Sequence, residues 1–136
     1  MNGDTTMPAP IGDEPSARLQ RAMVYVGDLQ RSVAFYTTVG LVVTTQDDEV
    51  ARLADAGGAT LVLHERENAG QVATRGCRLY FAAADADEVM DQLRATHPET
   101  EVLEPVRRMP WGRRHGYLLD PDGWEISIFE PEGDEG

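Results

Sequence analysis

Alternating hydrophobic and polar residues mark several short segments of the chain, and each such segment predicts a β-strand. The clearest is residues 124–129, in which Ile126 and Ile128 share one face. The opposite face carries Glu125, Ser127 and Phe129. This strand therefore has one apolar face for a core and a second face of mixed chemistry, where a binding site would lie.

A tight turn precedes this strand and joins it to another apolar segment. Residues 117–119 are apolar, and residues 120–123 read Asp-Pro-Asp-Gly. The proline presets φ and the glycine supplies a positive φ, as a turn requires. The pattern therefore predicts a β-hairpin at the end of the chain.

The first half of the chain predicts a strand, a helix and three further strands. Asp28 is placed to cap a helix through Thr38, and Gly40 is placed to end it. The predicted strands are residues 19–26, 41–46, 50–54 and 60–65.

The second half repeats this order. Asp85 begins a predicted helix through Thr96, and the predicted strands are residues 77–83, 102–109, 114–120 and 124–129. At an offset of 57 residues, Arg21 aligns with Arg78 and Met23 with Tyr80. A repeat in so short a chain indicates duplication. We therefore expect an α+β fold of two tandem β-α-β-β-β modules, with curved mixed sheets enclosing a cavity.

The expected organisation has two modules between two tails. The predicted segments are a disordered tail (1–17), the first module (18–66), a linker loop (67–75), the second module (76–131) and an acidic tail (132–136).

Charge and composition narrow the class of protein. The net charge is −12, but residues 1–17 and 130–136 hold seven acidic and no basic residues, which leaves about −5 for the body. This charge argues against a nucleic-acid partner. No apolar stretch is long enough to span a membrane, so we expect a cytoplasmic protein with no membrane partner. The single cysteine, Cys77, is expected to be a buried small residue.

Three motifs carry a resemblance to a known family. They are the Asp-Leu-x-x-Ser-x-x-Phe-Tyr run within residues 26–36, the Pro-Trp-Gly turn at 110–112, and Tyr-x-x-Asp-Pro-Asp-Gly at 117–123. With the paired modules, they make residues 19–131 resemble the vicinal oxygen chelate superfamily, which includes glyoxalase I, bleomycin resistance proteins and extradiol dioxygenases. The metal-free drug-binding resistance proteins are the most similar in character.

The resemblance also implies where a metal would be bound. Enzymes of the superfamily place His, Gln or Glu ligands at positions that here hold Arg21, Val62, Arg78 and Ser127. None of these side chains is a suitable ligand for a divalent cation. Glu125 lies two residues before the usual position of the last ligand. We therefore expect no metal and no other cofactor.

Histidines offer one alternative to this expectation. His64 shares a strand face with Thr60 and Val62, and His115 begins the seventh strand. With Glu125 these histidines would form a relocated metal site, although no spacing motif supports it. The third histidine, His97, is expected to be a solvated loop residue.

The remaining residues on the mixed faces suit a bulky, partly aromatic and partly polar ligand. Aromatic rings offer flat apolar surface, and guanidinium groups stack or donate hydrogen bonds. The alternative is a purely structural role. Tyr25 and Tyr80 would then fill the interior of a barrel, and Arg21 and Arg78 would pair with Glu125 or Glu65. The predicted ligand-binding residues are Arg21, Met23, Tyr25, His64, Arg78, Tyr80, Trp111, Glu125, Ser127 and Phe129.

The function these residues favour is sequestration of an antibiotic-like natural product by a homodimer, as in bleomycin resistance. No catalytic residue is assigned, because no nucleophile-base pair and no phosphate loop is visible in the sequence. The alternative is a glyoxalase- or dioxygenase-like lyase or oxidoreductase. It would use the relocated metal site, or metal-free chemistry with His64 or Tyr25 as proton shuttle.

Overall fold

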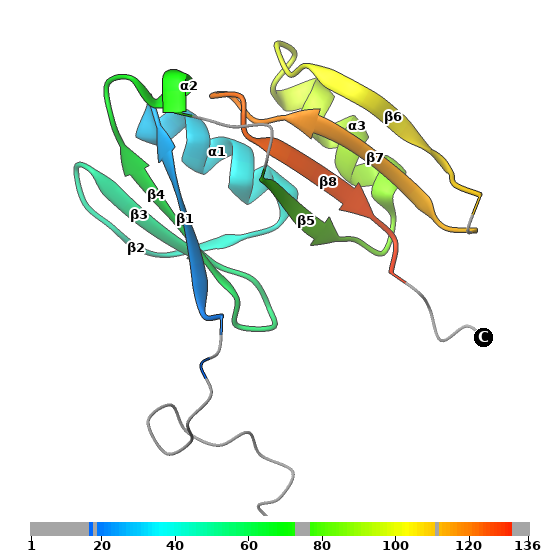
Figure 1. Ribbon diagram of the computed structural model, residues 1–136, viewed down its shortest axis with the longest axis horizontal. Helices are drawn as coiled ribbons and strands as arrows, with labels where there is room; N and C mark the ends of the chain where they lie inside the picture. The colour runs from blue at the N-terminus through cyan, green and yellow to red at the C-terminus, as the bar shows by residue number, and fades with distance from the viewer. Residues whose placement is uncertain (1–16, 18, 73–76, 111, 132–136) are drawn as a thin grey trace, which may run out of the picture.

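A computed structural model describes residues 17, 19–72, 77–110 and 112–131 of the chain. Its elements follow the predicted repeat (Figure 1). The first module consists of β1 (Arg21–Val26), α1 (Leu29–Val39), β2 (Val42–Gln46), β3 (Val50–Ala54) and β4 (Thr60–Glu65). The second consists of β5 (Arg78–Ala82), α3 (Ala86–Thr96), β6 (Val102–Arg108), β7 (Arg114–Leu119) and β8 (Glu125–Phe129). Between them lies a four-residue helix, α2 (Ala69–Val72), in the segment expected to be a loop.

Each module forms one four-stranded mixed sheet. Sheet A has the order β1-β4-β3-β2, and sheet B has the order β5-β8-β7-β6. In each sheet the first strand runs parallel to the last, and the other pairs are antiparallel. The α+β fold and its paired mixed sheets are thus confirmed. The two sheets are open and remain separate from each other.

The two long helices begin in the same way. Asp28 and Asp85 accept hydrogen bonds from backbone N–H groups one turn into α1 and α3. A glutamate at the end of β4, and another directly after β8, accepts a hydrogen bond from the first backbone N–H of the helix in its module. Glu65 accepts from Leu29 at 3.2 Å and Glu130 from Ala86 at 3.0 Å. These glutamates therefore fix each helix to its sheet.

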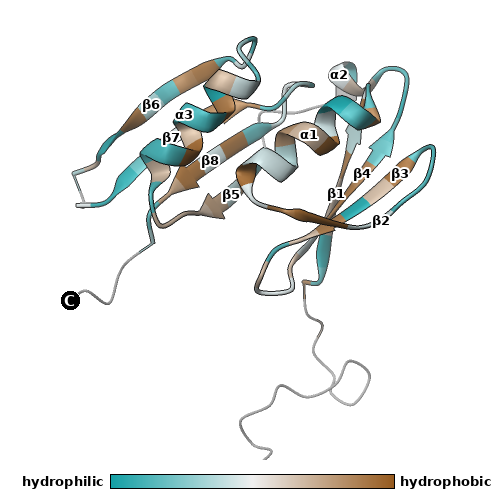
Figure 2. Ribbon diagram, turned by 180° about the vertical axis from the view of Figure 1, so that it is seen from behind, coloured by the Kyte–Doolittle hydropathy of each residue, from teal (hydrophilic) through white to brown (hydrophobic). Residues whose placement is uncertain are grey.

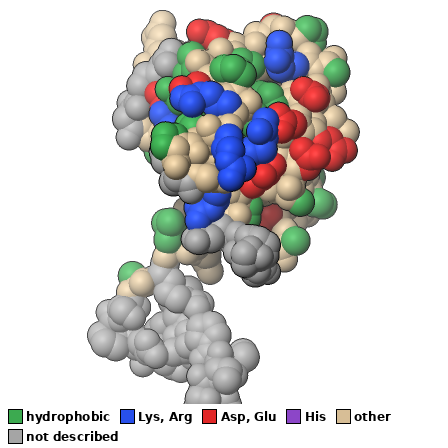
Figure 3. Space-filling model, turned by 90° about the vertical axis from the view of Figure 1, so that its right-hand side faces the viewer, with side chains coloured by type: hydrophobic (Ala, Val, Ile, Leu, Met, Phe, Trp, Pro, Cys, Tyr) green, Lys and Arg blue, Asp and Glu red, His purple; other side chains and the backbone are tan. Residues whose placement is uncertain are grey.

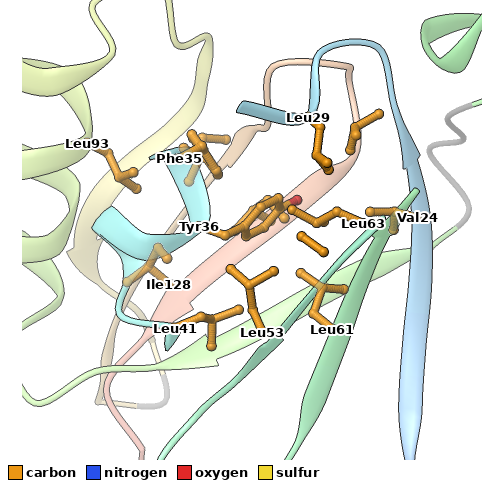
Figure 4. Close-up of a cluster of buried hydrophobic side chains, with 14 of the residues drawn as sticks. Val24, Leu29, Phe35, Tyr36, Leu41, Leu53, Leu61, Leu63, Leu93 and Ile128 are labelled. Carbon is orange, nitrogen blue, oxygen red and sulfur yellow. The ribbon is translucent and has the colours of Figure 1, made fainter. Parts of the chain in front are cut away.

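The core lies where the helices meet the sheets and each other. α1 contacts sheet A and α3, and α3 contacts sheet B. Phe35 and Tyr36 are fully buried at the centre, with aliphatic side chains of both modules around them (Figure 4). Figure 2 shows hydrophobic segments on the helices and on the strands beside them. Because one face of each sheet is packed in this way, the opposite face is left open.

The β7–β8 turn of the second module forms hydrogen bonds with the first module. The residues that form them are Asp120, Asp122 and Trp124, and we call this set of three residues the module latch. The buried Asp120 accepts a 2.5 Å hydrogen bond from the Tyr36 hydroxyl. Asp122 accepts one from the backbone N–H of Gly27 at 2.9 Å, and the Trp124 indole donates to the Tyr25 carbonyl at 2.9 Å. Polar contacts therefore join the modules beside the apolar core.

One glycine allows β6 to bulge beside β7. The β6–β7 register shifts between Glu104 and Arg107, opposite Gly116. A Cβ at Gly116 would lie 2.8 Å from the Val106 backbone nitrogen and 2.9 Å from the Glu104 carbonyl oxygen. The bulge can therefore pack here only against a residue without a side chain.

Two sequence expectations about single residues are wrong. Cys77 is exposed, because it lies just before β5 and outside the packed face. His97 is buried rather than solvated. It ends α3 and turns toward α1, where its ring lies 5.6 Å from Phe35, edge to face.

Candidate functional site

The open face of sheet B gathers most of the polar and aromatic side chains of the second module. β5 contributes Arg78 and Tyr80, β8 contributes Glu125, Ser127 and Phe129, and β7 contributes His115 and Tyr117. Strand alternation puts these residues opposite the apolar side chains of Ile126 and Ile128, which enter the core. We use "open face of sheet B" for this set of seven residues.

Arg78 is held in a fixed orientation on this face. Its Nε donates to Glu125 at 3.1 Å, and its guanidinium carbon lies 4.0 Å from the centre of the Tyr117 ring. Desolvation by burial is the largest single effect and opposes the charge, but the hydrogen bond to Glu125 and the charge interactions with Tyr80, Glu125 and Tyr117 together raise the pKa of Arg78 above its ordinary value. Arg78 is therefore a permanent cation whose position is set by a carboxylate and a ring.

Three rings stand beside this arginine and border a hollow of about 400 Å³. Tyr80 lies 6.4 Å from His115 in a stacked arrangement and 5.9 Å from Phe129, edge to face. The hollow is lined by Arg78, Tyr80, Glu104, Met109, Arg113, Arg114, His115, Tyr117, Phe129 and Glu130. Figure 3 shows arginine and acidic side chains close together on the side of the molecule that carries sheet B. The hollow has the size of a small-molecule site.

Ion pairs at the rim of the hollow reduce the net positive charge of its lining. Arg114 binds Asp87 through two hydrogen bonds of 2.7 and 3.1 Å, and Arg107 contacts Glu104 at 3.2 Å. Because these arginines have acidic partners, the hollow combines guanidinium donors with aromatic walls without a large excess of positive charge. Such a lining suits a neutral or weakly charged aromatic molecule.

The open face of sheet A carries the other predicted binding residues. Tyr25 lies 5.7 Å from His64, and the Arg66 guanidinium lies 4.7 Å from the Tyr25 ring centre. Met23 is 47% exposed on the same face, and Arg21 is exposed at its end. This face has fewer aromatic groups than the open face of sheet B, because it offers only the Tyr25 ring and the His64 imidazole.

The structure thus divides the predicted site residues between two sheets. Arg78, Tyr80, Glu125, Ser127 and Phe129 come together on sheet B. Arg21, Met23, Tyr25 and His64 come together on sheet A. Trp111 lies outside the described residues.

Sequence reasoning missed Tyr117 as a site residue, along with much of the rim. The missed lining residues are Glu104, Met109, Arg113, Arg114, Tyr117 and Glu130. A signal for Tyr117 was present, since alternation along β7 puts it on the same face as His115. Apart from Glu130, which follows β8, the rim residues belong to the β6–β7 hairpin, and only pairing of these strands brings them to the hollow.

The described residues do not fit a divalent metal at the positions that the resemblance implies. Arg78 occupies one of them as a cation, and Ser127 offers a single neutral hydroxyl. The relocated set does not assemble within one chain, because His64 belongs to sheet A, whereas His115 and Glu125 belong to sheet B. Three acidic side chains lie close enough together to share a cation, those of Asp85, Asp87 and Glu130. Each of them already caps α3 or binds Arg114.

Comparison with known proteins places this fold in a family. Residues 18–128 match the Glyoxalase/Bleomycin resistance protein/Dioxygenase superfamily, and the chain belongs to it. No match was found among curated proteins. No helix in the described part of the chain is long and apolar enough to cross a membrane.

Several solved structures share the fold. A protein of unknown function from Agrobacterium tumefaciens is 26% identical, with a TM-score of 0.70 over 88% of this chain and 98% of its own. A bleomycin resistance determinant encoded on the transposon Tn5 is 18% identical, with a TM-score of 0.64 over 86% and 100%. A lactoylglutathione lyase from Agrobacterium tumefaciens is 22% identical, with a TM-score of 0.62 over 86% and 96%. The neighbours thus include a resistance protein and an enzyme, and they share the architecture but not one function.

Proposed function

We propose that this protein binds and sequesters a small, partly aromatic natural product of the antibiotic type. The observation that carries the proposal is the hollow of sheet B, in which Arg78 is fixed between Glu125 and Tyr117 and faces Tyr80 and Phe129. Binding needs such a shaped and partly polar surface, and it needs neither a metal nor an acid-base pair. The fold likeness to a bleomycin resistance determinant is consistent with this role.

A titration tests the proposal directly. The purified protein is titrated by calorimetry with bleomycin and with a set of aromatic antibiotics, and each compound is recovered after denaturation and analysed by mass spectrometry. We expect one compound class to bind stoichiometrically and to be recovered unchanged. Recovery of a chemically altered compound would instead show turnover.

The second candidate is an enzyme, and the position of His115 favours it. This imidazole borders the hollow, and its pKa is lowered by burial and then by the nearby Arg78. It is therefore neutral at neutral pH and suited to accept a proton. Tyr25 and His64, which lie together on sheet A, are the other candidates for metal-free proton transfer.

Metal analysis separates binding from the metal-dependent form of this alternative. Because Arg78 and Ser127 stand at two of the implied ligand positions, we expect no stoichiometric Zn, Fe, Mn or Ni after dialysis without chelator. The measurement is elemental analysis of the wild type and of His64→Ala. A full equivalent of metal that is lost in His64→Ala would contradict the expectation and support an enzyme.

We also propose that two copies of the chain associate through their open faces. Tyr80 is 61% exposed and Met23 is 47% exposed, so each face presents large apolar side chains to solvent. A two-fold dimer would cover them and close each hollow with a second wall. The expected mass by light scattering at micromolar concentration is twice 15.0 kDa. Tyr80→Asp should shift the protein to the monomer, whereas Ala34→Asp, at an exposed position of α1 on the covered side of sheet A, should leave the dimer intact. A monomeric wild type would remove the shared cavity.

A further inference from the structure

Two buried polar atoms on the open face of sheet B have no hydrogen-bond partner among the described residues. They are Nδ1 of His115 and Oγ of Ser127. Ser127 is completely buried, on the face of β8 opposite to Ile126 and Ile128. A buried polar atom without a partner costs free energy, so such atoms are rare in folded proteins. Two of them on one face indicate that a bound molecule supplies the missing hydrogen bonds.

The two atoms belong to neighbouring positions of the sheet. His115 on β7 pairs with Phe129 on β8, and Ser127 pairs with Tyr117. Ser127 and His115 are therefore diagonal neighbours on one face, within reach of a single small group. His115 borders the hollow itself, and Ser127 lies deeper, flanked by Tyr80 and Tyr117. Tyr80, the strand partner of Ser127, is 61% exposed, and its ring contacts those of His115 and Phe129.

The surroundings favour a flat ring with a hydroxyl group. Tyr80, Tyr117 and Phe129 offer ring faces and edges, and Arg78 stacks on Tyr117. Burial lowers the pKa of His115, and the positive charges of Arg78 and Arg107 lower it further, against an opposing effect of Glu104. The imidazole is therefore neutral, and in one tautomer its Nδ1 accepts a hydrogen bond. A serine hydroxyl can donate to the same ligand oxygen.

We propose that the open face of sheet B recognises a hydroxylated aromatic ring, whose hydroxyl donates to His115 Nδ1 and accepts from Ser127 Oγ. This inference rests on the proposed binding function and narrows its ligand to the phenol class. A ring that carries a methoxy group in place of the hydroxyl has no proton to donate and leaves His115 without a partner. Discrimination between two such rings is therefore the property to measure.

The probes are 2-naphthol and 2-methoxynaphthalene, titrated into the full-length protein at neutral pH by calorimetry. We expect the wild type to prefer 2-naphthol by roughly fivefold to tenfold, the size expected for one net hydrogen bond. His115→Phe should reduce this preference toward equal affinity. Ser127→Ala removes a donor that the oxygen of either probe can accept, so it should weaken the binding of both probes. Thr37→Ala is the matched control, because it removes an exposed hydroxyl on α1, which lies on neither open face, and it should keep the preference. His64→Phe is a further variant that tests whether the open face of sheet A contributes.

Thermal unfolding distinguishes a ligand-binding serine from a structural one. Since Ser127 Oγ makes no hydrogen bond to the described protein residues, the melting temperature of Ser127→Ala without ligand should equal or exceed that of the wild type. This variant keeps the test available if His115→Phe folds poorly. A marked fall in its melting temperature would show a structural hydroxyl and overturn its assignment to the ligand.

The remaining outcomes separate this inference from the proposed function. Equal affinity of the wild type for the two probes would overturn recognition of the hydroxyl but leave an aromatic binding site in place. Failure of both probes to bind would overturn the ring class, while the antibiotic titration would still decide sequestration. A preference that is lost in His64→Phe and kept in His115→Phe would move the polar recognition to sheet A and overturn the proposal.

Discussion

Replacing Asp120 with alanine is expected to lower the free energy of unfolding by about 3 kcal/mol, because it leaves several donors of the module latch without an acceptor. The Tyr36 hydroxyl and the backbone N–H groups of Asp122 and Trp124 all donate to this carboxylate. Tyr36 is fully buried and would find no water as a substitute. Urea denaturation of wild type and variant measures the change.

The first module supplies a matched control for this substitution. Asp55 accepts from the N–H groups of Gly57 and Ala59 in the β3–β4 turn, as Asp120 does in its own turn. That turn is exposed and the described structure gives Asp55 no hydrogen bond from the other module. Asp55→Ala should therefore cost only about 1 kcal/mol. Equal losses in the two variants would show that the contact with Tyr36 adds nothing to stability.

The same carboxyl makes stability depend on pH. Burial raises the pKa of Asp120 above its ordinary value of 3.8, although its hydrogen bonds oppose this. The folded state therefore holds the proton more tightly than the unfolded state, so this group adds stability as the pH falls through the folded pKa toward 3.8. Asp120→Asn, which does not titrate, should lack this contribution when the two proteins are compared across mildly acidic pH.

Replacing Gly116 with alanine should destabilise the protein by about 2 to 3 kcal/mol, the usual cost of overpacking a well-filled site. The added Cβ would lie within 3 Å of backbone atoms of Glu104 and Val106, which cannot move without separating β6 from β7. His115 and Tyr117 flank Gly116, so the hollow would be distorted as well. We therefore expect weaker ligand binding together with faster amide hydrogen exchange in β6.

Gly57→Ala is the control for the glycine substitution. A Cβ at Gly57 would meet only Asp55 Oδ1, at an ordinary contact distance of 3.5 Å. Its effect on stability should stay within about 0.5 kcal/mol, as for most surface changes. If Gly116→Ala were equally mild, the β6 bulge would be adaptable and the glycine would not be required by packing.

Local signals in the sequence were sufficient to predict much of the fold. The capping residues Asp28 and Asp85 correctly mark where α1 and α3 begin, and strand alternation correctly assigns Ile126 and Ile128 to the core. His97 was misjudged because its burial depends on a contact with Phe35 of the other module. No local pattern contains that contact.

The candidate site was predictable only one strand at a time. The face shared by Glu125, Ser127 and Phe129 follows from alternation alone. The stacking of Arg78 on Tyr117 depends instead on the order of strands in sheet B, in which β8 separates β5 from β7. The loss of a hydrogen-bond partner at Ser127 is a property of the packed surroundings, which no single strand specifies.

The division of the open faces between two separate sheets has a genetic consequence. In a dimer that closes each cavity with sheet A of one subunit and sheet B of the other, the two walls of every cavity come from two different chains. A chain damaged only on sheet A and a chain damaged only on sheet B would then complement each other, since their heterodimer retains one cavity with two intact walls. A cavity built within each chain would show no such complementation, so two inactive alleles expressed together would remain inactive.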